Sequence, residues 1–364
     1  MAPTRRGSQQ GPVARFERSP IADWPAIHAI TLPTPWDTDS VQVYLIESDP
    51  LTLVDCGLDD EPSWLALGAA LDSLGHGVED LRRVVLTHHH RDHFGLAERL
   101  RESADALEVW AHAESAPYVE RFSSERDESV HETAELFLEF GVPRELVRTI
   151  GEQRRRKLAG EPPRCRATRV DRLLRDGDRV GFKDFALEVL HSPGHTAGHI
   201  VLHHEPSRVL LTGDQLMSGA VPNTENYFVG AWPEPSDPLR RRPRFRGLVE
   251  YRRSLRRLRA LPLRALLPGY GGVIRNPERA IREALLYYDV RVQRIERSLR
   301  SVSAIGQWVS AFEIWRALFP GESPLAGMRS HLLTIIGALD VLESDGLCTS
   351  TRRDDGVLVH RHAS

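Results

Sequence analysis

Four residues of the types that bind metal ions fall within six positions of the chain, in the segment Thr-His-His-His-Arg-Asp-His at residues 87–93. They are His88, His90, Asp92 and His93. The apolar run at residues 81–86 predicts a buried strand immediately before them. Side chains two positions apart in extended backbone point the same way, so His88 and His90 can converge on one point. Asp92 and His93 would then come from the turn that follows.

Imidazole and carboxylate groups together are the ligand set of zinc, and of iron or manganese at similar sites. A run of histidines can also be a solvated loop. Four potential ligands with alternating spacing, placed directly after a buried strand, favour a metal centre over that alternative. The sequence therefore predicts one or two metal ions, zinc first.

Length and composition indicate a large globular protein. The chain has 364 residues, a hydrophobic fraction of 41%, a net charge of −3 and a pI near 6.6. This charge gives no global reason to expect a polyanionic partner. The three cysteines are few, odd in number and far apart, which argues against a disulfide framework and favours a cytoplasmic location.

The first 20 residues are polar, basic and rich in Gly, Pro and Gln, so we predict a flexible tail there. Nowhere does the sequence contain an apolar run long enough to span a membrane, and no membrane association is expected. The oligomeric state stays open, with a homo-oligomer among the alternatives.

Strand-like and helix-like segments alternate through the first third of the chain, which predicts layers of sheet and helix. Residues 41–54 have the pattern of a hairpin, residues 62–75 that of a helix, and residues 107–110 that of a strand. The segment at about residues 115–160 breaks the alternation and predicts a helical insertion, serving either as a lid over a site or as a packing hairpin.

The pattern His-x-His-x-Asp-His resembles the signature of the metallo-β-lactamase superfamily. Further motifs follow in that family's order: Asp-Cys-Gly at residues 55–57, Pro-Gly-His-Thr at residues 193–196 and Thr-Gly-Asp at residues 212–214. The resemblance implies an αββα sandwich, an α/β fold, with the metal site at one edge between its two sheets. It covers about residues 25–298.

The same resemblance implies a role for each matched residue. His88, His90 and His195 would form the first metal site with Asp214, and Asp92 and His93 would form the second, with Asp214 bridging the two. Asp55 would support the ligands from behind. A carboxylate in that place can hold the free N–H of a ligating imidazole and fix its tautomer.

One position departs from the family pattern. The superfamily normally places its last histidine in Pro-Gly-His-Gly, and this chain has Pro-Gly-Tyr-Gly with Tyr270. A phenol is a poor ligand unless it is deprotonated, and its reference pKa is near 10. Three alternatives follow: Tyr270 ligates a metal, it donates a hydrogen bond to the substrate, or the second metal binds weakly.

The C-terminal region, residues 299–364, has the order helix, helix, hairpin and resembles a winged-helix domain, leaving residues 21–298 as the metallo-β-lactamase-like domain. Arginines crowd residues 240–259. They predict a solvated helix face, with an anion-binding or RNA-contacting face as the alternative.

These features together predict a metal-dependent hydrolase that uses a metal-bound hydroxide on an ester, a thioester or a lactone of a small-molecule substrate. Asp92 would orient the hydroxide or take its proton. Two alternatives belong to other classes: a metal-dependent ribonuclease or nucleic-acid-binding protein, which is the less favoured, and a non-catalytic metal-binding protein that acts through its C-terminal domain.

Overall fold

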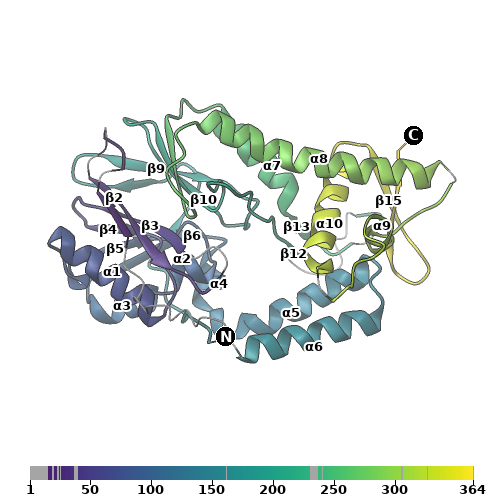
Figure 1. Ribbon diagram of the computed structural model, residues 1–364, viewed down its shortest axis with the longest axis horizontal. Helices are drawn as coiled ribbons and strands as arrows, with labels where there is room; N and C mark the ends of the chain where they lie inside the picture. The colour runs from purple at the N-terminus through teal and green to yellow at the C-terminus, as the bar shows by residue number, and fades with distance from the viewer. Residues whose placement is uncertain are drawn as a thin grey trace, which may run out of the picture.

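A computed structural model describes residues 15–18, 20–22, 24, 26–36, 40–160, 162–229, 237–239, 241–304, 306–325 and 327–363. Most of the tail predicted at residues 1–20 therefore lies outside the described residues. The chain is arranged as two sheets with helices on their outer faces, and a group of helices and a hairpin beside them (Figure 1).

The first sheet has seven strands in sequence order, from β1 to β7. They are β1 Arg15–Arg18, β2 Ile27–Pro33, β3 Ser40–Ile46, β4 Thr52–Val54, β5 Arg83–Val85, β6 Glu108–His112 and β7 Arg172–Leu174. The pairs from β1 to β4 are antiparallel and those from β4 to β7 are parallel. Val43 and Leu45 on one face pack with helices α1 (Glu61–Leu74) and α3 (Ala97–Ser103), while Tyr44 and Ile46 face the second sheet.

The second sheet has five strands in the order β14-β11-β10-β9-β8. Their bounds are β8 Arg179–Gly181, β9 Ala186–His191, β10 Ile200–His204, β11 Val209–Gly213 and β14 Ala265–Pro268. One face contributes Val189, Leu202 and Leu211 to the core between the sheets. The other packs against α7 (Gly247–Arg259) and α8 (Pro277–Ser303). The four layers form the αββα sandwich that the sequence predicted.

Short elements connect these layers at the edge where the polar motifs lie. They are α2 (Arg91–Phe94), α4 (Ala116–Glu120) and the two-stranded ribbon of β12 (Asn226–Phe228) and β13 (Arg244–Arg246), whereas the 3₁₀ turn η1 (Val78–Asp80) precedes β5 at the opposite end of that strand. Polar side chains held on such connections are placed by the rigid strands on either side.

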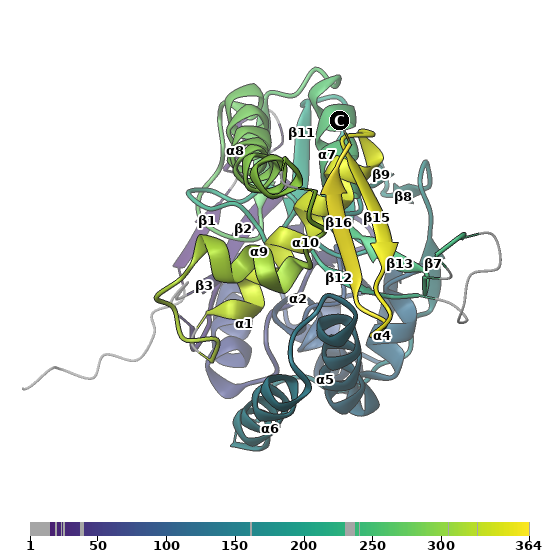
Figure 2. The same cartoon turned by 90° about the vertical axis from the view of Figure 1, so that its right-hand side faces the viewer.

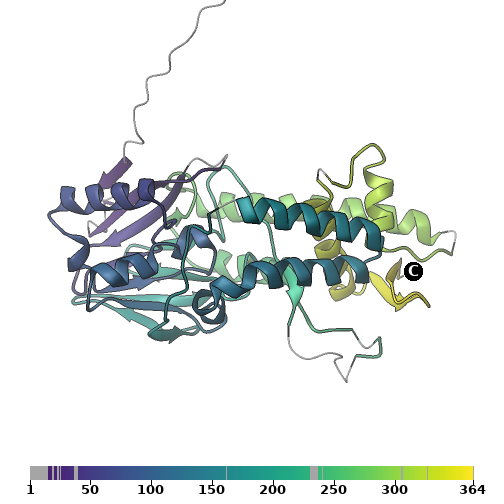
Figure 3. The same ribbon diagram turned by 90° about the horizontal axis from the view of Figure 1, so that it is seen from below.

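The predicted helical insertion forms two antiparallel helices, α5 (Phe122–Glu139) and α6 (Arg144–Gly160). The pair extends from the sandwich toward the C-terminal elements (Figure 3). Phe137 and Phe140 are buried in the same apolar cluster as residues of the C-terminal helices. The insertion thus packs against the C-terminal helices.

The C-terminal elements follow the predicted order of helix, helix and hairpin: α9 (Ala311–Leu318), α10 (Met328–Ser344), β15 (Cys348–Arg352) and β16 (Leu358–His362). They lie between α8 and the α5–α6 pair (Figure 2). Helix α8 continues through the predicted domain boundary at residues 298 and 299. One apolar cluster joins α7, α8, α10 and α5, so these elements pack as an extension of the outer helical layer. The winged-helix assignment stays a prediction.

The arginine-rich segment is used largely for ion pairs inside the chain. The pairs are Arg241 with Glu343, Arg242 with Glu135, Arg244 with Asp340, Arg246 with Glu343, Arg252 with Asp289, Arg253 with Glu250 and Arg257 with Asp176. Arg240 lies outside the described residues. Because carboxylates match so many of these charges, the segment offers little uncompensated charge to a polyanion.

The pair of Arg244 and Asp340, with Nη2 and Oδ1 2.5 Å apart, is buried on both sides. We expect Asp340→Ala to lower the free energy of unfolding by about 3–5 kcal/mol, because it leaves a buried guanidinium without its counter-charge. Urea denaturation measures this loss. The exposed pair of Arg279 and Glu283 supplies the control, and Glu283→Ala should leave the midpoint unchanged. Equal effects of the two substitutions would contradict the assignment.

Candidate metal centre

The predicted metal ligands come from the ends of strands in both sheets. His88 and His90 follow β5, and Asp92 and His93 lie in α2. His195 lies in the loop between β9 and β10, Asp214 directly follows β11, and Tyr270 comes two residues after β14. Because these strand ends meet at one edge of the sandwich, residues more than 180 positions apart in sequence come together.

The first donor group consists of His88, His90, His195 and Asp214, whose ligand atoms all lie within 4.8 Å of one another. His90 Nδ1 is 3.0 Å from His88 Nε2 and 2.9 Å from His195 Nε2. Asp214 Oδ2 is 3.5 Å from His195 Nε2. The arrangement brings three nitrogens and one oxygen to a single point.

The second donor group consists of Asp92, His93 and Asp214. His93 Nε2 lies 3.5 Å from Asp92 Oδ2 and 3.3 Å from Asp214 Oδ1. His93 Nε2 and Asp214 Oδ1 are both buried, and neither has a hydrogen-bond partner among the residues that the structure describes. Buried polar atoms are rarely left unpaired without a reason, and here a cation would satisfy both.

Asp55 fixes the ring nitrogens of His93 and His88 that point away from the centre, directly for His93 and through Thr87 for His88. Its Oδ2 is 2.8 Å from His93 Nδ1 and accepts a hydrogen bond from the Thr87 hydroxyl at 2.8 Å. Thr87 Oγ1 is in turn 3.0 Å from His88 Nδ1. Since the Thr87 proton goes to Asp55, the Thr87 oxygen accepts from His88. Both imidazoles are therefore protonated at Nδ1, and the Nε2 of each faces the centre, where that of His88 is unprotonated.

The other two histidines are fixed by a segment that precedes β12. His195 Nδ1 donates to the carbonyl oxygen of Asn223 at 2.8 Å, and His90 Nε2 donates to Glu225 Oε1 at 3.0 Å. The inward atoms, His195 Nε2 and His90 Nδ1, are then unprotonated too. With the outward nitrogens carrying the protons, the inward nitrogens, 2.9–3.0 Å apart, are free to bind a common cation, so the donor set fits a metal ion.

The electrostatics of the two groups differ. Burial, assisted by the neighbouring His93, lowers the pKa of His88 well below its usual value. Burial acts in the same direction on His93, but Asp214, Asp55 and Asp92 outweigh it and raise the pKa of His93 well above its usual value. The second group is thus rich in negative charge and favours a positive one.

Tyr270 makes a contact that the sequence analysis did not name. Its hydroxyl donates a hydrogen bond to Asp92 Oδ2. Burial, together with the charge of Asp92, raises the pKa of the Tyr270 phenol, so the group is neutral near pH 7. A neutral phenol that already donates to Asp92 orients that carboxylate.

The neighbouring histidines have other roles. His191 Nε2 donates to the carbonyl oxygen of Ala197 at 2.7 Å, and its ring stacks on His112. His199 Nε2 accepts the backbone N–H of Asp214 at 3.2 Å and so helps to hold that residue in place. Neither His191 nor His199 belongs to a donor group found among the described residues.

Sequence reasoning missed Thr87, Asn223 and Glu225. Thr87 directly precedes His88, and its hydroxyl could have been recognised there as a candidate hydrogen-bond partner. Glu225 is 135 positions from His90 and lies in no motif, and Asn223 acts through its backbone carbonyl, so the sequence carries no signal for either.

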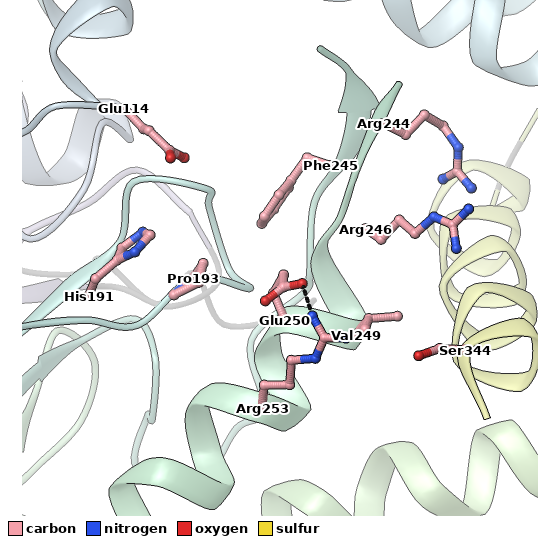
Figure 4. A pocket seen from close by; sticks show the side chains of 10 residues that line it. All are labelled: Glu114, His191, Pro193, Arg244, Phe245, Arg246, Val249, Glu250, Arg253 and Ser344. Carbon is pink, nitrogen blue, oxygen red and sulfur yellow. Dashed lines mark hydrogen bonds and ion pairs between the residues drawn. The ribbon is translucent and has the colours of Figure 1, made fainter. Parts of the chain in front are cut away.

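A separate pocket of about 370 Å³ lies between β9, β13, α7 and the end of α10 (Figure 4). It is lined by Glu114, His191, Pro193, Arg244, Phe245, Arg246, Val249, Glu250, Arg253 and Ser344. None of the metal-donor residues lines it. Arg244, Arg246 and Arg253 already pair with carboxylates, so the pocket presents largely neutralised charge.

Comparison with known proteins agrees with this fold and site. Residues 36–270 match the metallo-β-lactamase superfamily, and the chain belongs to that family. It is a metallohydrolase of the metallo-β-lactamase fold. Among the described residues, no helix is both long and apolar enough to cross a membrane.

The chain is 32% identical over 326 residues to the probable metallo-hydrolase YqjP of Bacillus subtilis, covering 88% of this chain and 93% of that protein. It is 28% identical over 197 residues to the hydroxyacylglutathione hydrolase GloC of Haemophilus influenzae, covering 50% and 76%. The crystal structure of the metallo-β-lactamase family protein TTHA1429 from Thermus thermophilus has the same fold, with a TM-score of 0.67, 24% identity and coverage of 93% and 99%.

Gly269 allows the close approach of the second donor group. A Cβ at this position would lie 2.6 Å from Asp214 Oδ1 and 2.8 Å from His93 Cε1, whereas a Cβ at Gly272 in the same loop would meet nothing within 4 Å. We expect Gly269→Ala to displace both side chains and to weaken zinc binding at least tenfold, with Gly272→Ala unchanged. Titration with a chromogenic chelator measures the affinity. Equal affinity in the two variants would contradict the packing argument.

Proposed function

We propose that this protein hydrolyses acyl bonds of small-molecule substrates, with thioesters as the first choice and esters and lactones as the alternatives, and that zinc is its metal. The observation that carries the proposal is the convergence of three imidazole nitrogens and the Asp214 carboxylate on one point. Iron and manganese share this ligand set.

His88, His90, His195 and Asp214 would hold the first ion, and Asp92, His93 and Asp214 would hold a second, more weakly bound one. The second group has one nitrogen fewer than the family pattern implies, because Tyr270 stands where the superfamily normally places its last histidine. A divalent ion in such a site makes water acidic enough to attack at neutral pH and polarises a carbonyl oxygen.

Asp92 is the group best placed to handle the proton of the attacking water. Its Oδ2 accepts the hydrogen bond of Tyr270 and lies 3.5 Å from His93 Nε2, which leaves Oδ1 to accept the proton. Despite burial, the positive neighbour His93 lowers the pKa of Asp92, so the carboxylate is ionised near pH 7. Tyr270 acts as a positioning residue that fixes the plane of this carboxylate.

The choice of a thioester is supported by the relative GloC, whose name gives a hydroxyacylglutathione as its substrate. The donor groups themselves do not separate a thioester from an oxygen ester or a lactone, because all three present a carbonyl carbon to the same nucleophile. A nucleic acid is the less favoured partner, because so many arginines of residues 240–259 are engaged with carboxylates inside the chain.

Purified protein should hydrolyse an S-acylglutathione, lose activity on chelation and regain it with zinc. His88→Ala and Asp214→Ala should lower kcat/KM at least 100-fold with the fold retained, because each removes a donor from the first group. Release of free thiol, p-nitrophenol and ring-opened lactone from three substrates ranks the classes. Glu250→Ala, which removes the ion pair with Arg253 and no metal donor, serves as control. Zinc-independent turnover would refute the proposal.

Restoring a nitrogen at position 270 should complete the second donor group. We expect Tyr270→His to raise the zinc content by close to one ion per chain and Tyr270→Phe to leave it unchanged, because a phenyl ring also supplies no donor. Elemental analysis of protein dialysed against dilute zinc measures both. Two ions per chain in the native protein and in both variants would show that the second group is complete without residue 270.

A further inference from the structure

A short segment before β12 contacts two histidines of the first donor group from the side away from the centre. Glu225 Oε1 lies 3.0 Å from His90 Nε2, and the carbonyl oxygen of Asn223 lies 2.8 Å from His195 Nδ1. The superfamily motifs of this chain do not include the segment, which lies between β11 and α7. It supports His90 and His195 in the same way that Asp55 and Thr87 support His93 and His88.

His90 differs from its neighbours in the nitrogen that it turns inward. His88, His93 and His195 direct Nε2 to the centre, whereas His90 directs Nδ1 there. A neutral imidazole carries its proton on only one nitrogen, so His90 must be the Nε2–H tautomer if Nδ1 is to bind a metal. An acceptor beside Nε2 selects that tautomer, and Glu225 is the one that the structure places there.

The backbone holds Glu225 in place. Its N–H donates to the carbonyl oxygen of Gly194 at 3.3 Å, and its own carbonyl accepts from the N–H of Gly247 at 3.0 Å. A Cβ at Gly247 would lie 2.2 Å from the Glu225 carbonyl oxygen and 2.7 Å from that of Gly194, so only glycine allows this approach. The segment is thereby tied both to the loop that carries His195 and to the start of α7.

A chain of polar contacts continues from the segment to the C-terminal helix. Asn226 Oδ1 accepts from Arg244 Nη1 at 2.7 Å, and Arg244 pairs with Asp340 of α10. Asn226 follows Glu225 in the chain, so the ion pair of Arg244 and Asp340 is connected to His90 through these two residues. This gives the C-terminal elements a physical connection to the site.

We propose that Glu225 is a positioning residue that selects the metal-binding tautomer of His90 and holds its ring toward the ion. The inference rests on the proposed function, because it presupposes a metal in the first donor group. Glu225 raises the basicity of His90 as a ligand, in the way that carboxylates behind metal-bound histidines do. It does not contact the reacting atoms.

The first test measures metal affinity. Glu225→Ala should bind cobalt(II) about 10–100-fold more weakly than the native protein, and the visible absorption of the bound cobalt should change as His90 reorients. Glu225→Gln keeps an oxygen acceptor and should recover most of the affinity. Glu250→Ala is the matched control, because that carboxylate is similarly half-buried, with 31% of its side chain exposed against 28% for Glu225, and pairs with Arg253.

The second test uses the native protein and does not depend on a variant that folds. Long-range proton–nitrogen spectra of the zinc-loaded protein should show His90 protonated at Nε2, and His88, His93 and His195 at Nδ1. A His90 protonated at Nδ1 would overturn the inference, as would equal cobalt affinity and spectra in native protein and Glu225→Ala. Absence of any metal binding by the native protein would instead refute the proposed function.

Discussion

The structure depends on one electrostatic constraint: several imidazoles must direct unprotonated nitrogens at a common point. This arrangement is favoured when each outward N–H has an acceptor and a cation occupies the centre. The acceptors come from three places in the chain. Asp55 directly follows β4, Thr87 comes shortly after β5, and Asn223 and Glu225 precede β12. Each acceptor is held by backbone next to a strand of a sheet or to a helix that packs on it.

The two sheets supply the rigidity that this constraint requires. Their inner faces form one apolar core, in which Tyr44 and Ile46 of the first sheet pack with Leu202 and Leu211 of the second. This shared apolar core fixes the position of one sheet against the other, and with it the loops at the strand ends. The Tyr44 hydroxyl also donates to the carbonyl of Pro268 at 2.7 Å, which connects the first sheet directly to the strand that leads to Tyr270.

The convergence of the donor residues was predictable from sequence because their types and order are local signals. His88 and His90 alternate at a strand end, and His195 and Asp214 lie in short Gly-containing motifs, so each could be recognised without knowing what it contacts. Their acceptors could not be recognised in the same way. The hydrogen bond from His90 to Glu225 joins positions 135 apart. In the sequence, Glu225 cannot be distinguished from any other glutamate in a loop between two elements. The sandwich was predictable from alternation and resemblance, whereas the packing of α5 and α6 with α10 depends on distant apolar contacts.

Tyr270 shows how a single substitution changes the use of a site without disturbing its frame. Gly269 still brings the chain within contact distance of Asp214 and His93, as the family pattern requires, yet the side chain that follows supplies a hydroxyl in place of an imidazole. That hydroxyl donates a hydrogen bond to Asp92. The bond fixes the orientation of the carboxylate and occupies one of the oxygen lone pairs that could bind an ion. The first donor group shares only Asp214 with the second, and its other three members are fixed independently of Tyr270. The missing nitrogen therefore affects only the second group, and the first group keeps all four of its donor residues.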